Sequence, residues 1–361
     1  MTPFAIAGIQ MPITTNSNLD AMRHRLELVL HLYPWVQMVM YSELAPFGPL
    51  LPNAQKLPGP AEEAFQEMAL KHGVWLLPGS LFERRDGLIF NTAPVINPAG
   101  EVVARYRKMF PFRPFEEGVT SGDEFVVFDV PQVGRFGVSI CYDIWFPETS
   151  RTLTAMGAEV LLHPVLTHTI DRDVDLNLAR ATAAFCQCYV FDINGLHAGG
   201  NGQSAVIDPA GRTLHQAGVN EEMIPIEVDL DQVRRQRQYG LRGLGQPLKS
   251  FRDSNVDFSI YDQQRRDLSY LSSLGPLAKP QRAAIHLDNP PQASDPAPLD
   301  NVPPTVADPA PLDNVPPTVA DPTPLDNIPP TADLGSTVVN EPVPAEALNP
   351  VLHTPAPTTE Q

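Results

Sequence analysis

Three short segments of the chain carry the side chains best suited to covalent chemistry. Glu43 follows an apolar run, residues 36–41, that predicts a buried strand, and Lys108 lies at the end of a hairpin strand. Cys141 closes a further apolar strand, and Pro147, a residue typical of the first turn of a helix, comes soon after it. Helix amides and a lysine cation near such a Cys would lower the pKa of its thiol below about 8.5 and favour the nucleophilic thiolate.

Each of these residues also has an ordinary structural explanation. A free Cys is most often a small buried apolar side chain, and an isolated Glu43 or Lys108 could be a surface charge. Cys186 and Cys188 are too closely spaced for the usual zinc or redox motif with a two-residue gap, so we expect both to pack in the core. The histidines expected on helices have no spacing suited to a metal.

The elements that must position these residues alternate between helix and strand, with hairpins among them. This pattern predicts an α/β domain with a mixed sheet. Strands are expected at residues 4–11, 36–41, 74–79, 88–97, 101–106, 125–130, 136–140, 160–162, 189–194, 204–208 and 224–228, and helices at 19–32, 61–72, 147–156 and 173–186.

The composition changes sharply after Ile285. Of the 40 prolines, 19 lie in residues 286–361, which hold 11 Asp or Glu and no Lys or Arg. A 13-residue unit, DPAPLDNVPPTVA, starts at Asp295 and again at Asp308. So much proline and so little apolar surface predict a disordered acidic tail, either a spacer or the ligand of a proline-binding partner. The sequence thus divides into a folded domain at 1–270 that includes an arm from about 230, a linker at 271–285 and the tail at 286–361.

Charge and composition exclude several classes of protein. Because 11 of the 42 acidic residues lie in the tail, the first 285 residues carry 31 acids against 25 bases, which argues against nucleic-acid binding. Three Cys are too few for a disulfide scaffold, and no stretch approaches the roughly 20 apolar residues of a membrane span. The chain starts without the features of a signal peptide. We therefore expect a soluble cytoplasmic protein with no membrane partner.

Taken together, the three segments resemble the nitrilase superfamily, the carbon–nitrogen hydrolases with a Glu-Lys-Cys triad. The order of the three residues matches, and five segments match in their local sequence: residues 40–46, 104–112, 137–148, 157–164 and 202–211. The similarity covers roughly residues 3–230. Two positions depart from the pattern: Ser42 stands where many members have Pro, and Trp145 stands where several branches have Arg, which leaves the substrate class open.

The resemblance implies a four-layer α-β-β-α sandwich and a role for each matched residue. Cys141 would be the nucleophile and Glu43 the general base. Lys108 and the backbone N–H of Tyr142 would stabilise the oxyanion. No metal or organic cofactor is expected, because these groups already supply the nucleophile and the electrophile.

Further site residues are expected around this triad. The family often has a second Glu about eight residues after the Lys, and Glu116 fits this spacing better than its neighbour Glu117. The substrate pocket is expected to involve Phe112, Trp145, His163 and His168.

The resemblance favours the hydrolysis of a small linear amide through a thioester, with release of ammonia. A nitrilase and an N-carbamoyl amide hydrolase are the alternatives, and a catalytically idle scaffold with a proline-rich interaction tail is a remote one. Family members generally pair, and residues 240–274 mix Arg with aromatic side chains, so we expect a homodimer or higher homo-oligomer.

Overall fold

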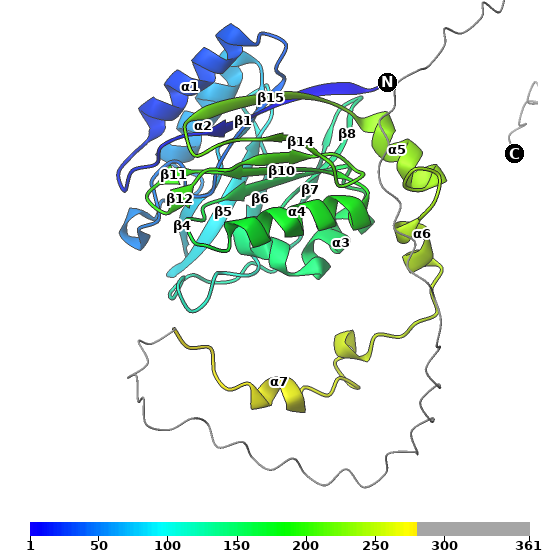
Figure 1. Cartoon of the computed structure of the whole chain (residues 1–361). Helices are drawn as coiled ribbons and strands as arrows, with labels where there is room; N and C mark the ends of the chain where they lie inside the picture. Colours follow the sequence, from blue (N-terminus) through cyan, green and yellow to red (C-terminus); the bar gives the residue numbers. More distant parts are fainter. Residues whose placement is uncertain (280–361) are drawn as a thin grey trace, which may run out of the picture. The chain divides into compact units, whose positions relative to one another are not determined.

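Two β-sheets packed face to face, with helices on their outer sides, form the body of the protein (Figure 1). The computed structural model describes residues 1–279. The predicted tail and the end of the predicted linker lie outside the described residues. Across residues 1–279, none of the helices is both long and apolar enough to cross a membrane.

The first sheet has seven strands in the order β15-β1-β2-β3-β5-β4, and β6 pairs with β5. Strands β1, β2 and β3 run parallel, whereas β4, β5, β6 and β15 pair with their neighbours in antiparallel fashion. The strands are β1 (Pro3–Gln10), β2 (Met38–Tyr41), β3 (Trp75–Leu77), β4 (Leu81–Arg85), β5 (Leu88–Ile96), β6 (Val102–Arg107) and β15 (Glu222–Asp229).

The second sheet has six strands in the order β14-β13-β10-β9-β8-β7. Its strands are β7 (Val127–Val130), β8 (Gly134–Val138), β9 (Val160–Val165), β10 (Tyr189–Asn194), β13 (Ala205–Ile207) and β14 (Thr213–Gln216). A separate ribbon consists of β11 (Leu196–His197) and β12 (Gly200–Asn201). Strands β8, β9 and β10 are parallel, so their carboxyl ends lie at one edge of the sheet.

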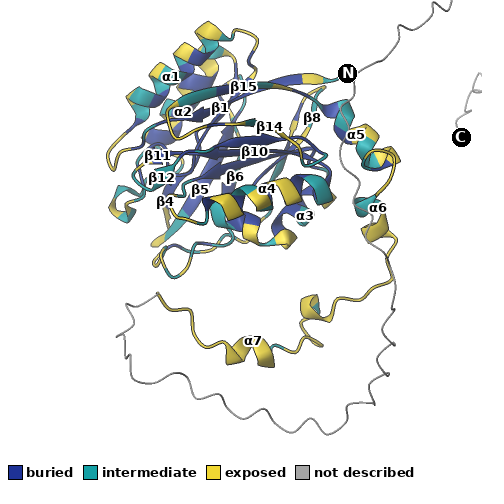
Figure 2. Ribbon diagram, viewed as in Figure 1, coloured by how far each residue is buried: buried dark blue, intermediate teal, exposed yellow. Residues whose placement is uncertain are grey.

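Buried side chains fill three layers of core between the four structural layers (Figure 2). On β1, Phe4 and Ile6 pack between the sheets, whereas Ala7 and Ile9 pack toward the helices on the other face. Both faces of this strand are therefore buried, which explains why it reads as a continuous apolar run. The structure confirms the predicted α-β-β-α sandwich.

Amphipathic helices close the outer faces. In α1 (Leu19–Leu32), the buried residues Met22, Leu26 and Val29 recur at helical spacing and face the first sheet together with α2 (Pro60–His72). Gly73 ends α2 in the left-handed conformation, with φ of 64°. Helices α3 (Pro147–Ala155) and α4 (Arg172–Cys186) cover the second sheet.

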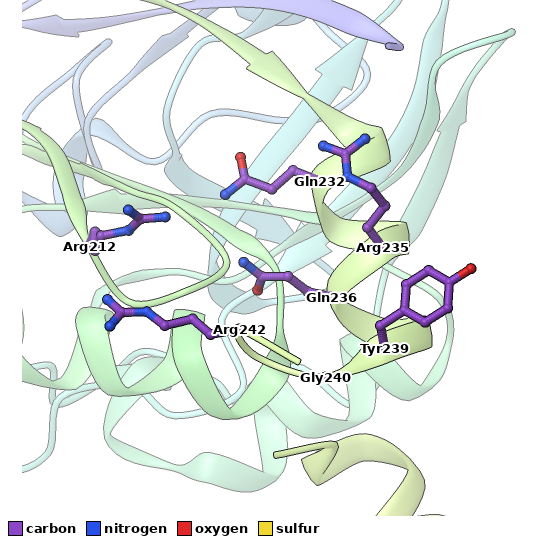
Figure 3. Close-up of a pocket in the computed structure, with 7 residues that line it drawn as sticks. All are labelled: Arg212, Gln232, Arg235, Gln236, Tyr239, Gly240 and Arg242. Atoms are coloured by element: carbon purple, nitrogen blue, oxygen red, sulfur yellow. The ribbon is translucent and has the colours of Figure 1, made fainter. Parts of the chain in front are cut away.

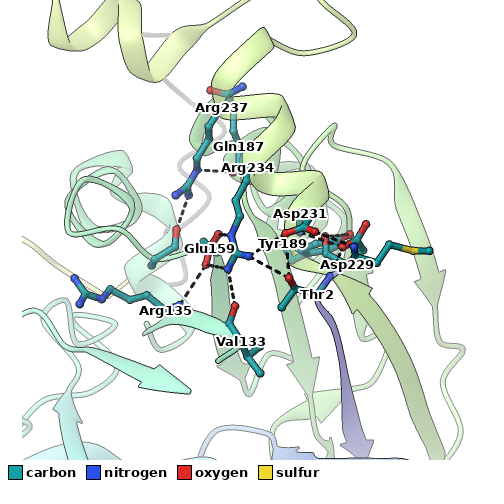
Figure 4. Close-up of polar contacts among 12 residues, drawn as sticks. Thr2, Val133, Arg135, Glu159, Gln187, Tyr189, Asp229, Asp231, Arg234 and Arg237 are labelled. Atoms are coloured by element: carbon teal, nitrogen blue, oxygen red, sulfur yellow. Dashed lines mark hydrogen bonds and ion pairs between the residues drawn. The ribbon is translucent and has the colours of Figure 1, made fainter. Parts of the chain in front are cut away.

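The segment after β15 begins with a helix, α5 (Leu230–Tyr239), where the sequence indicated only a polar arm. Arginines hold this helix to the body (Figure 4): Arg234 Nε donates to Glu159 Oε1 at 2.8 Å, and Arg237 Nε donates to Gln187 O at 3.1 Å. Hydropathy did not indicate this contact because long arginine side chains, and not apolar residues, make much of it. Beyond it lie α6 (Pro247–Arg252), the 3-10 turn η3 (Ser259–Tyr261) and α7 (Ser269–Ser273).

Candidate active site

The structure brings Glu43, Lys108 and Cys141 together, although they come from both sheets. Glu43 follows β2, Lys108 follows β6, and Cys141 follows β8. Lys108 Nζ lies 2.9 Å from Glu43 Oε1, and both side chains are almost fully buried. Cys141 lies beside them and lines the same cavity. The convergence predicted from the sequence motifs is therefore present.

Cys141 begins a tight turn, the 3-10 helix η2 (Cys141–Trp145), which leads into α3. Its φ of 46° is in the left-handed region, which costs a residue other than glycine on the order of 1–3 kcal/mol unless its surroundings enforce it. Asp143 helps to enforce it, because its Oδ2 accepts a hydrogen bond of 2.9 Å from the N–H of Ile140. Tyr142 stands in the first turn of η2, where amide N–H groups have no partner within the helix.

The same carboxylate connects this turn to the segment around Lys108. Asp143 Oδ2 also accepts the hydroxyl of Tyr106 at 2.6 Å, and its Oδ1 accepts the N–H of Phe110 at 2.9 Å. Tyr106 and Phe110 lie two residues to either side of Lys108. Asp143 thus fixes the Cys141 turn relative to the lysine.

The turn after β2 is fixed by both sheets. Glu43 N–H donates to Val165 O of β9 at 3.2 Å, and Leu44 N–H donates to Ser80 Oγ at 3.1 Å. Leu44 has a φ of 54°, so this turn too contains a left-handed residue. Gly79 allows the close approach, since a Cβ there would lie 1.8 Å from the carbonyl oxygen of Ser42.

A second carboxylate and an amide complete the surroundings of the lysine. Glu116 Oε2 lies 2.8 Å from Lys108 Nζ, so the ammonium group is held between two carboxylates. Asn91 Nδ2 donates to Glu43 Oε1 at 2.7 Å. Glu117 is exposed, so Glu116 is the one of these two glutamates that contacts the lysine.

Burial dominates the electrostatics of the site. It raises the pKa of Glu43, and the opposing charge of Lys108 does not fully offset it. Burial alone would lower the pKa of Lys108, but the charges of Glu43 and Glu116 raise it well above its ordinary value. The lysine is thus an ammonium ion at neutral pH.

The pKa of the Cys141 thiol is raised, whereas the sequence predicted that it would be lowered. Burial and then the charge of Glu43 raise the pKa of the thiol well above its ordinary value, and Lys108 opposes them only in part. The predicted lowering is wrong because burial disfavours the charged thiolate, and the nearby charge of Glu43 adds to this effect. The thiol of Cys141 is therefore protonated at rest, and the neighbouring Glu43 carboxylate, whose pKa is raised, can take its proton.

The three residues open into a cavity of about 650 Å³. Its wall combines a charged floor with apolar sides and the loop between β9 and α4. The side chains and loop residues that line it are Glu43, Leu44, Pro49, Lys108, Phe112, Phe115, Glu116, Cys141, Leu166, Thr167, His168, Thr169, Ile170, Asp171, Ala198 and Gly199. This is room for a small molecule whose reactive carbon sits next to the sulfur.

The comparisons with known proteins agree with this geometry. The family model described as carbon-nitrogen hydrolase matches residues 5–238. The chain belongs to the carbon–nitrogen hydrolase family, in the nitrilase superfamily.

The matches to relatives and to solved structures cover much of the folded part of this hydrolase. Omega-amidase NIT2 of Homo sapiens is 28% identical over 257 residues, which cover 66% of this chain and 93% of that protein. The 2-oxoglutaramate amidase of Bacillus subtilis is 32% identical over 184 residues, or 49% of this chain and 71% of that protein. The crystal structure of Saccharomyces cerevisiae Nit3 has a TM-score of 0.61 at 25% identity and covers 66% of this chain and 94% of that one.

Of the predicted pocket residues in this carbon–nitrogen hydrolase, Phe112 and His168 line the main cavity. Trp145 lines a small extension of about 20 Å³ that also contacts Cys141, and its Nε1 donates to Asp175 Oδ1 at 2.7 Å. His163 is not among the lining residues. It is buried, and its Nδ1 is 2.8 Å from Ser139 Oγ.

The physical reason for the placement of His163 is the length of its strand. The sequence predicted that the strand would end at Leu162, before Pro164, so that the histidine would follow it. Strand β9 instead continues to Val165, and Pro164 pairs with Ile193 in the sheet. Burial lowers the pKa of His163 to about 4, so the imidazole is neutral.

Two residues of the site were missed from the sequence. Asn91 lies inside β5, where its side chain reaches Glu43, and nothing in its local sequence marks it. Asp143 stands in the matched Cys-Tyr-Asp motif, so its position could have suggested a role at the Cys141 turn.

A separate hollow of about 320 Å³ lies at the carboxyl end of α5 and contains none of the three residues (Figure 3). It is lined by Arg212, Gln232, Arg235, Gln236, Tyr239, Gly240 and Arg242. Arg212 and Arg235 are paired with Asp208 and Asp229, so two of its three cations are already neutralised. Within residues 1–279, no group of three or more His, Cys, Asp or Glu side chains is placed to hold a metal ion.

Proposed function

We propose that this carbon–nitrogen hydrolase cleaves the carboxamide of a small linear amide, with Cys141 as the nucleophile. The observation that carries the proposal is the buried Lys108 ammonium, held between Glu43 and Glu116 beside the Cys141 thiol. Packing alone gives no reason to bury this set of charges next to a thiol at the floor of a cavity. The names of the relatives, an omega-amidase and a 2-oxoglutaramate amidase, support an amide as the substrate.

The first half of the reaction forms a thioester and releases ammonia. Glu43 takes the proton from the Cys141 thiol as the sulfur attacks the amide carbon. The negative charge that develops on the amide oxygen is stabilised by Lys108 and the N–H of Tyr142. Glu43 then gives its proton to the departing nitrogen, the carbon–nitrogen bond breaks, and ammonia leaves.

The second half of the reaction consumes water. Glu43 takes a proton from a water molecule as its oxygen attacks the thioester carbon, and the same oxyanion groups stabilise the second tetrahedral intermediate. The carbon–sulfur bond then breaks, the sulfur regains a proton from Glu43, and the carboxylic acid is released. The raised pKa of Glu43 suits both directions of proton transfer, because a carboxyl of ordinary pKa would be a weaker base.

Ammonia release from a panel of amides, nitriles and N-carbamoyl compounds tests the proposal. We expect turnover of amides and its loss in Cys141→Ala, while Cys186→Ala, a change to a thiol buried behind the second sheet, retains activity. Release from nitriles alone would make the protein a nitrilase. No release from any compound would support the idle scaffold, and full activity of Cys141→Ala would refute the cysteine mechanism.

We also propose that the chain forms a homodimer or a higher homo-oligomer in the cytoplasm. The predicted arm exposes aromatic side chains in residues 240–274, including Phe251 at 47% and Tyr270 at 75% exposure, which suit an interface. Sedimentation at micromolar concentration tests this, and a monomer would refute it.

A further inference from the structure

The charges around the cavity are strongly unbalanced. Its lining includes the carboxylates of Glu43, Glu116 and Asp171, whereas Lys108 is the one Lys or Arg among the described residues that line it. That lysine is already within 2.9 Å of two carboxylates. Beyond the reacting groups, the cavity therefore offers a substrate an acidic side chain and no unpaired basic one.

Neighbouring charges do not restore the balance. The guanidinium of Arg172 lies close to Asp192 and, at 3.9 Å, to Asp175, and it is 2% exposed. It lines neither the cavity nor its small extension. Burial and then the charge of Asp192 raise the pKa of Asp175 to about 6, and the charge of Arg172 opposes them only in part.

The other polar side chains that line the cavity belong to Thr167, His168 and Thr169, and the hydroxyl of Thr169 donates to Asp171. His168 Nδ1 lies 3.0 Å from the carbonyl oxygen of Gly199, so this nitrogen carries the hydrogen and donates it. The other ring nitrogen, Nε2, is then left to accept. Apolar side chains of the wall include those of Phe112, Phe115 and Ile170.

We infer that the part of the substrate remote from its carboxamide is neutral or positively charged, and that Asp171 is a specificity-determining residue that discriminates against substrates with a second carboxylate. The inference rests on the proposed amide hydrolysis and deepens it. A carboxylate within several ångströms of Asp171, with no cation to pair with, would weaken binding about 100-fold at the effective dielectric of a protein cleft. This preference is opposite in charge to the substrate named in 2-oxoglutaramate amidase.

Three amides that share one methylene chain test the inference: 6-aminohexanamide, heptanamide and the monoamide of heptanedioic acid. They place an ammonium, a methyl and a carboxylate at the same distance from the carboxamide. We expect the first two to exceed the third by about 100-fold in kcat/KM, measured as ammonia release against enzyme-free blanks. Turnover of the carboxylate compound equal to that of heptanamide would overturn the inference while leaving the proposed hydrolysis intact.

Asp171→Asn tests the residue, with Asp173→Asn as the matched control. Asn has nearly the shape of Asp, and the Asp171 side chain makes no capping hydrogen bond to α4, so the start of the helix should be preserved. Asp173 lies in the same helical turn but is exposed and does not line the cavity. We expect Asp171→Asn to reduce the ratio of cationic to anionic turnover by about tenfold or more and Asp173→Asn to leave it unchanged. Equal changes in both variants would overturn the role of Asp171.

Binding of the three amides to the Cys141→Ala variant tests this inference even if the proposed hydrolysis is not observed. If none of the three amides is turned over, calorimetry with this variant still ranks their affinities. Tighter binding of the ammonium and methyl compounds would support the inference. Tighter or equal binding of the carboxylate compound, or binding of none of the three, would overturn it.

Discussion

Replacing Glu116 by Gln removes one of the two negative charges that hold the lysine and keeps the shape of the side chain. Glu116 Oε2 is 2.8 Å from Lys108 Nζ, and the Glu116 side chain is only 17% exposed, so solvent screens the pair weakly. A hydrogen bond to a charged group contributes about 1.5–3 kcal/mol. If the misplaced lysine loses this much stabilisation of the oxyanion, kcat/KM falls about 10- to 150-fold.

The pH dependence of the same variant distinguishes this role from a merely structural one. The charge of Glu116 raises the pKa of Glu43, so its removal lowers that pKa. Because Glu43 must be ionised to accept the thiol proton, the acidic limb of the kcat/KM profile should move to lower pH. The assay is ammonia release across pH, with Glu117→Gln as the control because Glu117 is exposed. Activity of Glu116→Gln within twofold of wild type, or an equal loss in Glu117→Gln, would refute the reasoning.

Two further variants test the supports of the site. Asp143→Asn should lower kcat about tenfold with little change in KM and should destabilise the fold by about 1–3 kcal/mol. The reason is that an amide cannot accept all the hydrogen bonds that reach this carboxylate. Unchanged kinetics and an unchanged urea unfolding curve would contradict this prediction. The unfolded chain protonates His163 near its reference pKa of 6.5, whereas the folded protein does so near 4, so the contribution of this residue to stability should fall by about 2 kcal/mol from pH 7 to pH 5. His163→Gln should remove that loss and the exposed His31→Gln should not, and an unaltered pH dependence in His163→Gln would argue against a buried neutral imidazole.

The sequence predicted the fold well where local pattern and tertiary packing agree. Helix α1 has the predicted bounds because Met22, Leu26 and Val29 recur at helical spacing and the helix covers one sheet. Glu43, Lys108 and Cys141 were also predicted to follow the ends of strands, and they do so in the structure, because a turn at the end of a strand is a local feature. Strands β4 and β14 were not predicted, since their partly exposed residues lack a strong apolar pattern.

Features that depend on distant parts of the chain could not be predicted. The contact between Asn91 and Glu43 spans 48 residues of sequence, and the contact between Arg234 and Glu159 spans 75. The sign of the pKa shift of Cys141 depends on how deeply the thiol is buried and on the charge of Glu43 beside it, neither of which the motif alone gives. Glu116 could be separated from Glu117 only once the structure showed which of them reaches the lysine.

Intact-mass spectrometry of the enzyme quenched during turnover of an amide tests the role of Cys141 most directly. We predict a covalent adduct whose mass is that of the substrate less that of ammonia, located on the peptide that contains Cys141 and removed by hydroxylamine, as a thioester should be. The adduct should be absent in Cys141→Ala and present in Cys186→Ala. Sustained turnover with no adduct under rapid quench, together with an active Cys141→Ala, would contradict a thioester mechanism at this site.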